Sequence, residues 1–281
     1  MSINGVYFQV YREITSGDIA LPGLPDVALR VRRAVADEHN DLGKVVRIIQ
    51  TDPGLSAHLV RIANSPLYRT RVPAENLTSA VRCFGLEGTS NLVTSYILRS
   101  MYMSRSKVIR ELLTEVWQQS VKVAAISSVL ASRCRGFDPH SAMLAGLLQE
   151  IGALPLLNRL EKQKNLTMDK SELRAAVSKL TPQIGAHLLT HWGFDARYVE
   201  VARRRDAWQH DPEAPVHLAD LVLMARLHSF IGTPRMHKYP RIDQVTAYAK
   251  LPLGALSPHM SLVMLDEAGQ DIEEVRQLLA A

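Results

Sequence analysis

The strongest constraint on the fold of this chain is the helical spacing of its apolar residues, since the strict alternation of a β-strand is scarce. In residues 41–49 one helical face carries Leu42, Val45, Val46 and Ile49, and Asn40 or Asp41 is the candidate N-cap. Asp52-Pro53 then combines an N-cap residue with proline at the first helical position, which predicts a second helix. The sequence therefore predicts an all-α fold.

The same spacing continues to the end of the chain. It predicts a helix that carries Gln149 and Glu150, a terminal helix from about Asp271, and helices at 78–84, 87–103, 109–133, 171–180, 182–191, 196–208 and 215–231. Residues 103–107 predict a loop between two helical lobes, and residues 161–169 and 232–239 predict exposed loops.

Composition restricts the compartment and the partners. The two cysteines of the 281 residues, Cys83 and Cys134, lack ligand-like spacing, which favours free buried thiols and a reducing cytoplasm. The N-terminus lacks the pattern of a signal peptide, and every apolar run is shorter than the ~20 residues that span a bilayer, so we expect a soluble protein with no membrane partner. A net charge of +5 permits anionic partners without requiring them.

The stretch Ala-Gly-Leu-Leu-Gln-Glu-Ile-Gly at residues 145–152 resembles the "GLLHDIG" signature of the HD phosphohydrolase superfamily, with Gln149 and Glu150 in place of His and Asp. Further segments, in matching order and spacing, resemble the related HDOD domain; they are residues 21–25, 49–65, 79–86, 117–120, 185–192 and 218–220. The resemblance implies an all-helical fold, with an N-terminal helical lobe packed on a degenerate HD-like lobe, and a role in bacterial signal transduction.

The resemblance also implies domain limits. The HDOD domain is expected over residues 21–231, with lobes of about 21–105 and 106–231. An N-terminal segment (residues 1–20) precedes it, and a loop with a helical extension (residues 232–281) follows it.

The metal-ligand positions of the family can be matched one by one. By resemblance they fall on Gln119, Gln149, Glu150, Thr181, Arg205, Asp206 and Asp220, of which Asp220 alone is the residue that the family's site would use. Carboxamides are poor donors to a divalent transition metal, and an arginine would bring positive charge to the cation's place. We therefore expect no bound metal, no cofactor and no catalysis, because a metal-activated water would have no source.

Buried acids need partners, so we predict that Arg205 replaces the metal and pairs with Glu150, with Asp220, or with both. This would be an internal ion pair or a ligand pocket. The alternative is that the run Arg203-Arg204-Arg205 is an exposed helix face, as long basic side chains usually are.

Other polar clusters favour plain structural roles. His187 and His191 have the i, i+4 spacing of a zinc pair but fit a helix end equally well. A cluster of His217, Asp220 and His228 could line a pocket. Arg197 with the arginine run could bind a phosphate, yet the sequence offers neither a glycine-rich phosphate loop nor a recognition helix, so nucleic acid is not the expected partner.

The sequence does not predict a serine or cysteine nucleophile. Ser127-Ser128 lie in an apolar helix, and neither cysteine has an adjacent base to activate it. The sequence thus predicts a regulatory domain that binds an unidentified signalling protein or a small anionic ligand, through residues 52–65 or the pocket near Glu150. The alternative is a metal-dependent phosphohydrolase with an altered metal shell.

Overall fold

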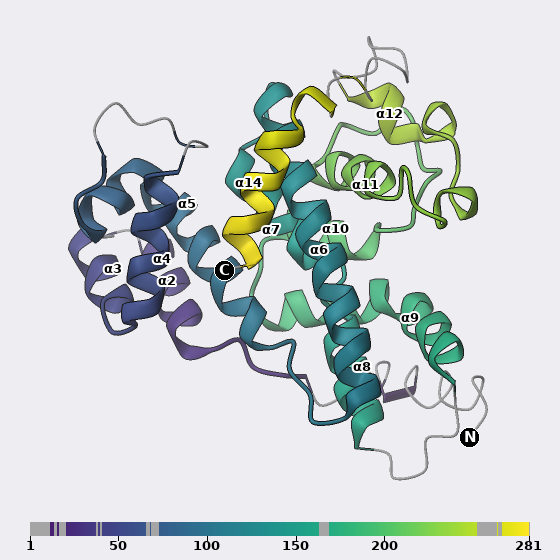
Figure 1. Ribbon diagram of the computed structural model, residues 1–281, viewed down its shortest axis with the longest axis horizontal. Helices are drawn as coiled ribbons and strands as arrows, with labels where there is room; N and C mark the ends of the chain where they lie inside the picture. The colour runs from purple at the N-terminus through teal and green to yellow at the C-terminus, as the bar shows by residue number, and fades with distance from the viewer. Residues whose placement is uncertain are drawn as a thin grey trace. The chain divides into compact units, whose positions relative to one another are not determined.

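The architecture is that of a computed structural model, in which every regular element of the described residues is helical (Figure 1). The structure describes residues 12–13, 16, 21–37, 39, 41–65, 68, 73–162, 169–251, 263 and 266–280. The predicted all-α fold is confirmed within these ranges, where no helix is long and apolar enough to cross a membrane. The predicted N-terminal segment and the loop at 161–169 lie mostly outside them.

The chain divides into two compact units. The smaller unit comprises residues 23–100 and 270–281, and the larger unit comprises residues 1–22 and 101–269. Each is described here by itself.

The smaller unit consists of α2 (Asp26–Ala36), α3 (Leu42–Ile49), α4 (Pro53–Ala63), α5 (Leu77–Ser100) and most of α14 (Gly269–Ala280). The predicted caps are present, since the side chains of Asp41 and Asp52 accept hydrogen bonds from the amides of Gly43 and Leu55. Within α5, Gly85 adopts φ 69° and separates the two helices predicted at 78–84 and 87–103, the second of which ends at Ser100.

The larger unit contains the long helix α6 (Lys107–Arg133), followed by α7 (Pro139–Leu148), α8 (Ala153–Glu161), α9 (Lys170–His191), α10 (Ala196–Arg203) and α11 (Leu218–Ser229). Short helical turns η1 (Met236–Lys238) and η2 (Ile242–Gln244) lead to α12 (Thr246–Lys250). Helix α6 packs against α7, α8 and α11, and α10 packs against α7, α9 and α11. The ends of α7, α10 and α11 therefore lie close together.

Three sequence predictions for this unit are wrong, and one of them is the helix expected at 196–208, because α10 ends at Arg203. The helix predicted to carry Gln149 and Glu150 ends at Leu148, so both side chains lie in the turn before α8. The helices predicted at 171–180 and 182–191 are one helix, α9, which continues through Pro182. A proline removes one intrahelical donor, here for the carbonyl of Ser178 four residues earlier, but the packing of α9 on α8 and α10 keeps the helix continuous.

Two glycines explain how closely the helices of this unit approach. A Cβ on Gly152, the residue before α8, would lie 2.2 Å from the carbonyl oxygen of Thr181 and 2.4 Å from the amide nitrogen of Gly185, both on α9. A Cβ on Gly146 of α7 would lie 2.5 Å from the Cα of Ala124 on α6. Both neighbours are backbone, which cannot move aside as a side chain can.

We expect Gly152→Ala to lower the free energy of unfolding by about 2–3 kcal/mol, because the added methyl group forces α8 away from α9. Gly23→Ala is the matched control, since a Cβ there meets no atom within 4 Å. Urea denaturation followed by circular dichroism measures both variants. Equal losses in the two would contradict the close approach.

Candidate functional site

The centre of the site is Glu150, a carboxylate that is 8% exposed in the turn between α7 and α8. Its neighbour Gln149 is fully buried and caps the C-terminal end of α7. The turn is fixed at one end by Gly152, whose lack of a side chain lets the chain pass against α9. A carboxylate in such a place requires compensating charge.

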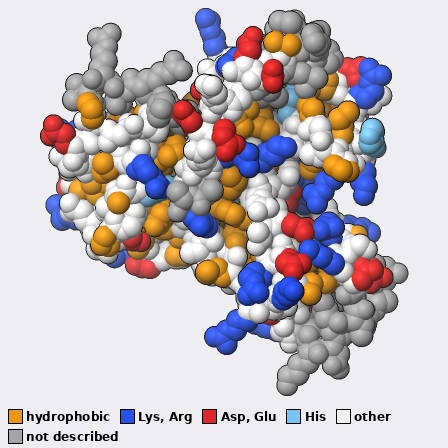
Figure 2. Space-filling model, in the orientation of Figure 1, with side chains coloured by type: hydrophobic (Ala, Val, Ile, Leu, Met, Phe, Trp, Pro, Cys, Tyr) orange, Lys and Arg blue, Asp and Glu red, His pale blue; other side chains and the backbone are white. Residues whose placement is uncertain are grey.

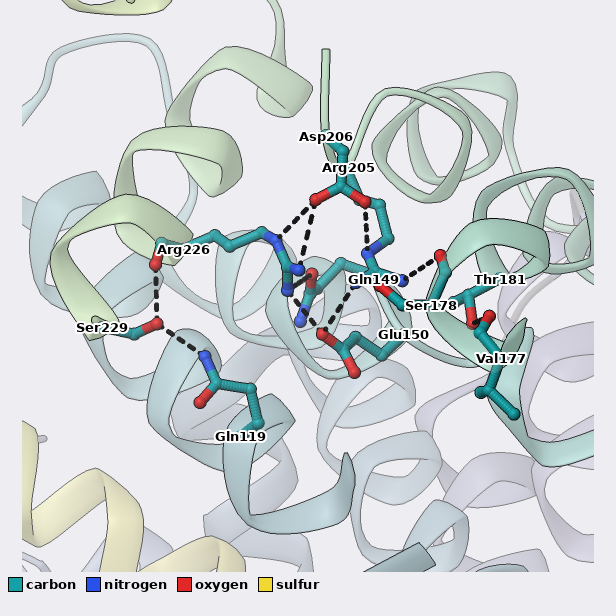
Figure 3. A network of polar contacts seen from close by, with 10 residues as sticks. All are labelled: Gln119, Gln149, Glu150, Val177, Ser178, Thr181, Arg205, Asp206, Arg226 and Ser229. Atoms are coloured by element: carbon teal, nitrogen blue, oxygen red, sulfur yellow. Dashed lines mark hydrogen bonds and ion pairs between the residues drawn. The ribbon is translucent and has the colours of Figure 1, made fainter. Parts of the chain in front are cut away.

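Two arginines supply that charge (Figure 3). Arg226 Nη1, from α11, donates to Glu150 Oε1 at 2.5 Å and to Gln149 Oε1 at 3.1 Å. Arg205 Nη2, from the turn after α10, lies 3.4 Å from the same oxygen of Glu150. Both guanidinium groups are buried, with 3% of each side chain exposed. Charge-assisted bonds to Arg226 are therefore the main stabilising contacts of Glu150.

Asp206 completes the network. Its Oδ1 lies 3.2 Å from Arg226 Nη2 and its Oδ2 lies 3.3 Å from Arg205 Nε, so the two acids and two arginines balance in charge. The amide of Gln149 must present its oxygen to Arg226, which leaves its Nε2 without a hydrogen-bond partner among the described residues.

The pKa values follow from this arrangement. Burial alone would raise the pKa of Glu150, but the charges of Arg205 and Arg226 outweigh burial and hold this pKa below its ordinary value. Burial and the like charge of Arg226 lower the pKa of Arg205, whereas the carboxylates of Glu150 and Asp206 outweigh burial and raise that of Arg226. Glu150 is thus ionised at neutral pH, and Arg226 is its better-matched partner.

The remaining family positions on α6 and α9 line the same region without joining the charge network. Gln119 Nε2 donates to Ser229 Oγ at 2.6 Å, which links α6 to the last residue of α11. Thr181 Oγ1 donates to the carbonyl of Val177 at 2.7 Å, within α9.

Asp220 belongs to a separate cluster. Its fully buried carboxylate lies 3.1 Å from Arg204 Nη2, 2.8 Å from His210 Nε2 and 3.3 Å from Lys250 Nζ. It does not pair with Arg205, so the alternative that made it the second partner of that arginine is wrong. Because Lys250 ends α12, this cluster holds α12 against the start of α11.

The three consecutive arginines, residues 203–205, lie in three different environments. The alternative prediction, that all three form one exposed helix face, is therefore wrong. Arg203 is exposed and pairs with Glu200, Arg204 is half-buried on Asp220, and Arg205 is buried on Glu150. Helix α10 ends at Arg203, so the next two side chains turn into the larger unit.

Other candidate clusters are not assembled into sites. His187, His191 and His217 are exposed, and the buried His228 contacts the carbonyl of its own helix residue Met224 at 2.7 Å. Ser127 and Ser128 are buried in α6. Both cysteines are free thiols; Cys134 is buried as predicted, whereas Cys83 is exposed, so the prediction that both are buried is wrong.

A cavity of about 330 Å³ opens beside the network. Its lining combines two acids, Glu115 and Glu150, with five basic side chains: Arg174, Arg205, Arg226, Arg235 and Lys238. Part of this charge is paired on the surface, where Lys170 and Arg174 of α9 lie 3.0 Å and 2.5 Å from Glu115 of α6. Figure 2 shows acidic and basic side chains mixed over these two helices.

A divalent metal does not fit this donor set. The carboxylate of Glu150 and the carbonyl oxygen of Gln149 already accept from one guanidinium group, and a second guanidinium lies beside them. Among the described residues no group of three or more His, Cys, Asp or Glu side chains could hold a metal ion.

Sequence reasoning missed Arg226. Apart from Asp220, it is the one charged residue in the otherwise apolar stretch 218–227, where a charge predicts a buried partner. That signal was available in the sequence, although it could not identify Glu150 as the partner.

The second candidate region, α4 of the smaller unit, contains a buried imidazole. His58 packs on the ring of Tyr96 at 4.7 Å between centroids, and Arg61 Nη2 donates to its Nδ1 at 2.8 Å. Burial, with the charges of Arg61 and Arg99, lowers the pKa of His58 to about 4. The ring is therefore neutral in the folded protein, as a packed core residue would be.

We expect Arg226→Met to lower the free energy of unfolding at pH 7 by about 3 kcal/mol, because it leaves a buried carboxylate with one distant partner. Glu150→Gln added to Arg226→Met should recover part of the loss, since it removes the unpaired charge. Urea denaturation measures both variants. The control Arg241→Met removes an exposed arginine that pairs with Asp243 and should stay within about 0.5 kcal/mol of wild type. If Arg226→Met were as stable as Arg241→Met, the stabilising role of the contact between Arg226 and Glu150 would be refuted.

His58 should make stability depend on pH. Between its ordinary pKa of 6.5 and the folded value of about 4, the unfolded chain binds a proton that the folded chain does not. The free energy of unfolding should therefore fall by about 1–2 kcal/mol from pH 7 to pH 5 through His58. His58→Gln should remove this part of the fall, with His187→Gln as the control for losing an exposed imidazole. An unchanged slope in His58→Gln would refute the expectation.

Comparisons with known proteins agree with this architecture. A crystal structure from Shewanella amazonensis SB2B, called a "Putative metal-dependent phosphohydrolase", is 27% identical, covers 99% of both chains and superposes with a TM-score of 0.84. An HDOD domain protein of unknown function from Geobacter sulfurreducens shares the fold at 18% identity and a TM-score of 0.64, covering 98% of this chain and 97% of that one. A "Putative signal transduction protein" from Marinobacter aquaeolei VT8 shares it at 22% identity and a TM-score of 0.67, covering 99% of this chain and 66% of that one.

Among curated proteins, an uncharacterized protein of Treponema pallidum (strain Nichols) is 23% identical over 246 residues. The match covers 84% of this chain and 45% of that relative, so the chain spans less than half of the relative's length. The sequence profile of the HDOD domain matches residues 21–209, a shorter stretch than the expected 21–231. With this match over more than half of its length, and with the helical fold described above, the chain belongs to the HDOD domain family.

Proposed function

We propose that this HDOD chain is a non-catalytic signal-transduction domain that acts by binding a protein partner or a small anionic ligand. The observation that carries the proposal is the pair of guanidinium groups on Glu150, in the region where related hydrolases would hold a metal. An arginine at that place compensates the carboxylate as a cation would, but it cannot activate a water molecule.

The two carboxylates at the family's metal positions, Glu150 and Asp220, also support a non-catalytic function. Glu150 stays ionised and is saturated by Arg226, so it is a poor general base for an attacking water. Asp220, the surviving family acid, pairs with Arg204 and Lys250 and contacts His210 in its own cluster. A reaction at the cavity would have neither of these two carboxylates as a free base.

The competing function is metal-dependent phosphohydrolysis with an altered shell. It is favoured by the 27% identity to the Shewanella structure, whose name assigns that activity as putative. The name of the Marinobacter structure, a putative signal transduction protein, suggests the regulatory role instead. We propose that the protein is located in the bacterial cytoplasm. Its two cysteines are free thiols, as is usual in a reducing compartment, and the similar Shewanella structure is bacterial.

Metal analysis and a phosphodiesterase assay together test the proposal. The full chain is purified, incubated with Mn²⁺, Fe²⁺ or Zn²⁺, desalted and assayed for bound metal and for hydrolysis of bis(p-nitrophenyl) phosphate. We expect no stoichiometric metal and a rate equal to that of Glu150→Gln. One metal per chain with hydrolysis that Glu150→Gln abolishes would establish the competing function.

A further inference from the structure

Arg205 is a buried arginine whose donors are poorly satisfied. Its three nitrogens lie 3.3 Å from Asp206, 3.4 Å from Glu150 and 3.4 Å from the carbonyl of Ser178, and its Nε makes no hydrogen bond with the described residues. Arg226, which is equally buried, has a contact of 2.5 Å to Glu150. Buried donors without good acceptors are uncommon and costly, and they indicate that an acceptor is missing.

The carbonyl of Ser178 adds to this picture. It faces Arg205 because Pro182 lacks the amide hydrogen that would bond to it inside α9. At 3.4 Å this hydrogen bond is long for a charged donor, and burial with the like charge of Arg226 lowers the pKa of Arg205. Arg205 therefore lines the cavity as a cation with unused capacity for an anion.

Arg235 and Lys238 add positive charge at the same cavity. Both side chains line it, both residues are exposed, and neither has an ion pair within the part of the chain that the structure describes. The acids of the lining are already engaged, Glu115 by Arg174 and Glu150 by Arg226. The cavity thus has three basic groups, Arg205 from the turn after α10 and Arg235 and Lys238 from the segment after α11, and both acids that line it already pair with arginines.

One wall of the cavity is apolar and aromatic. Phe230 and Tyr239 stack with 4.0 Å between ring centroids and 8° between their planes, and Leu112, Val116 and Leu157 extend the apolar lining. At about 330 Å³ the cavity is within the size of pockets that hold small organic molecules, and it exceeds what a single inorganic ion would fill.

We propose that this cavity binds an organic phosphate monoester, with the phosphate held by Arg205, Arg235 and Lys238 and the organic part against Phe230 and Tyr239. The inference deepens the proposed binding function and rests on it. A phosphate dianion matches the surplus charge better than a carboxylate, which brings one charge. The planar donors of Arg205 suit phosphate oxygens.

Calorimetric titration of the full chain with phenyl phosphate tests the proposal, with inorganic phosphate and benzoate as separate probes. We expect phenyl phosphate to bind at least 10-fold more tightly than either, because it alone supplies both the dianion and the ring. Equal affinities for phenyl phosphate and inorganic phosphate would refute the claim that the aromatic wall binds the organic part. The absence of binding heat with every probe would refute the claim that the cavity binds a phosphate.

Variants separate a built site from general attraction to a basic protein. Arg235→Gln with Lys238→Gln changes exposed side chains only and should weaken phenyl phosphate binding about 10-fold or more. Arg241→Gln with Lys44→Gln removes the same charge outside the cavity and should leave affinity unchanged. Arg205→Met should abolish binding. Equal weakening in the two double variants would overturn the proposal.

Measuring the phenol that hydrolysis of phenyl phosphate would release in the titrated samples separates failure of the non-catalytic function from failure of the phosphate site. Release of phenol that depends on added metal would overturn the proposed non-catalytic function. Absence of both phenol and binding would overturn the phosphate site alone and leave recognition of a protein partner as the mode of action.

Discussion

The larger unit depends on the neutralisation of one buried carboxylate. Glu150 is placed by the turn between α7 and α8, and its two ion pairs among the described residues are with Arg205, after α10, and Arg226, near the end of α11. Its charge could be retained in a buried place only if cations from those helices converge there. The same contacts therefore compensate Glu150 and fix three helix ends that are far apart in sequence.

The local part of the fold could be predicted from the sequence because its causes are local. Asp41 and Asp52 cap their helices through amides two or three residues away, which a short motif reveals. The continuation of α9 through Pro182 and the end of α7 before Gln149 could not be predicted. They follow from packing against α8 and from the approach of Gly152 to α9, which involve residues distant in the chain.

The site was predicted in part. Family positions led to Glu150 and Arg205, which the structure places 3.4 Å apart. The same reasoning grouped Asp220 with them and omitted Arg226. Matching the family's metal-ligand positions shows which residues occupy them, but it does not show which ion pairs these residues form. The deciding contact, Arg226 with Glu150, joins residues 76 positions apart. Which carboxylate Arg226 reaches depends on how the helices pack, and no local pattern in the sequence specifies that.

The shared oxygen of Glu150 has an evolutionary consequence. Arg205 and Arg226 approach the same Oε1, so a histidine substituted for either one would leave the other arginine in the coordination space of a metal. A return to metal binding would need both arginines and Gln149 to change together, while each single step would cost stability. Under the non-catalytic function that we propose, no single substitution at these three positions would therefore create a metal site.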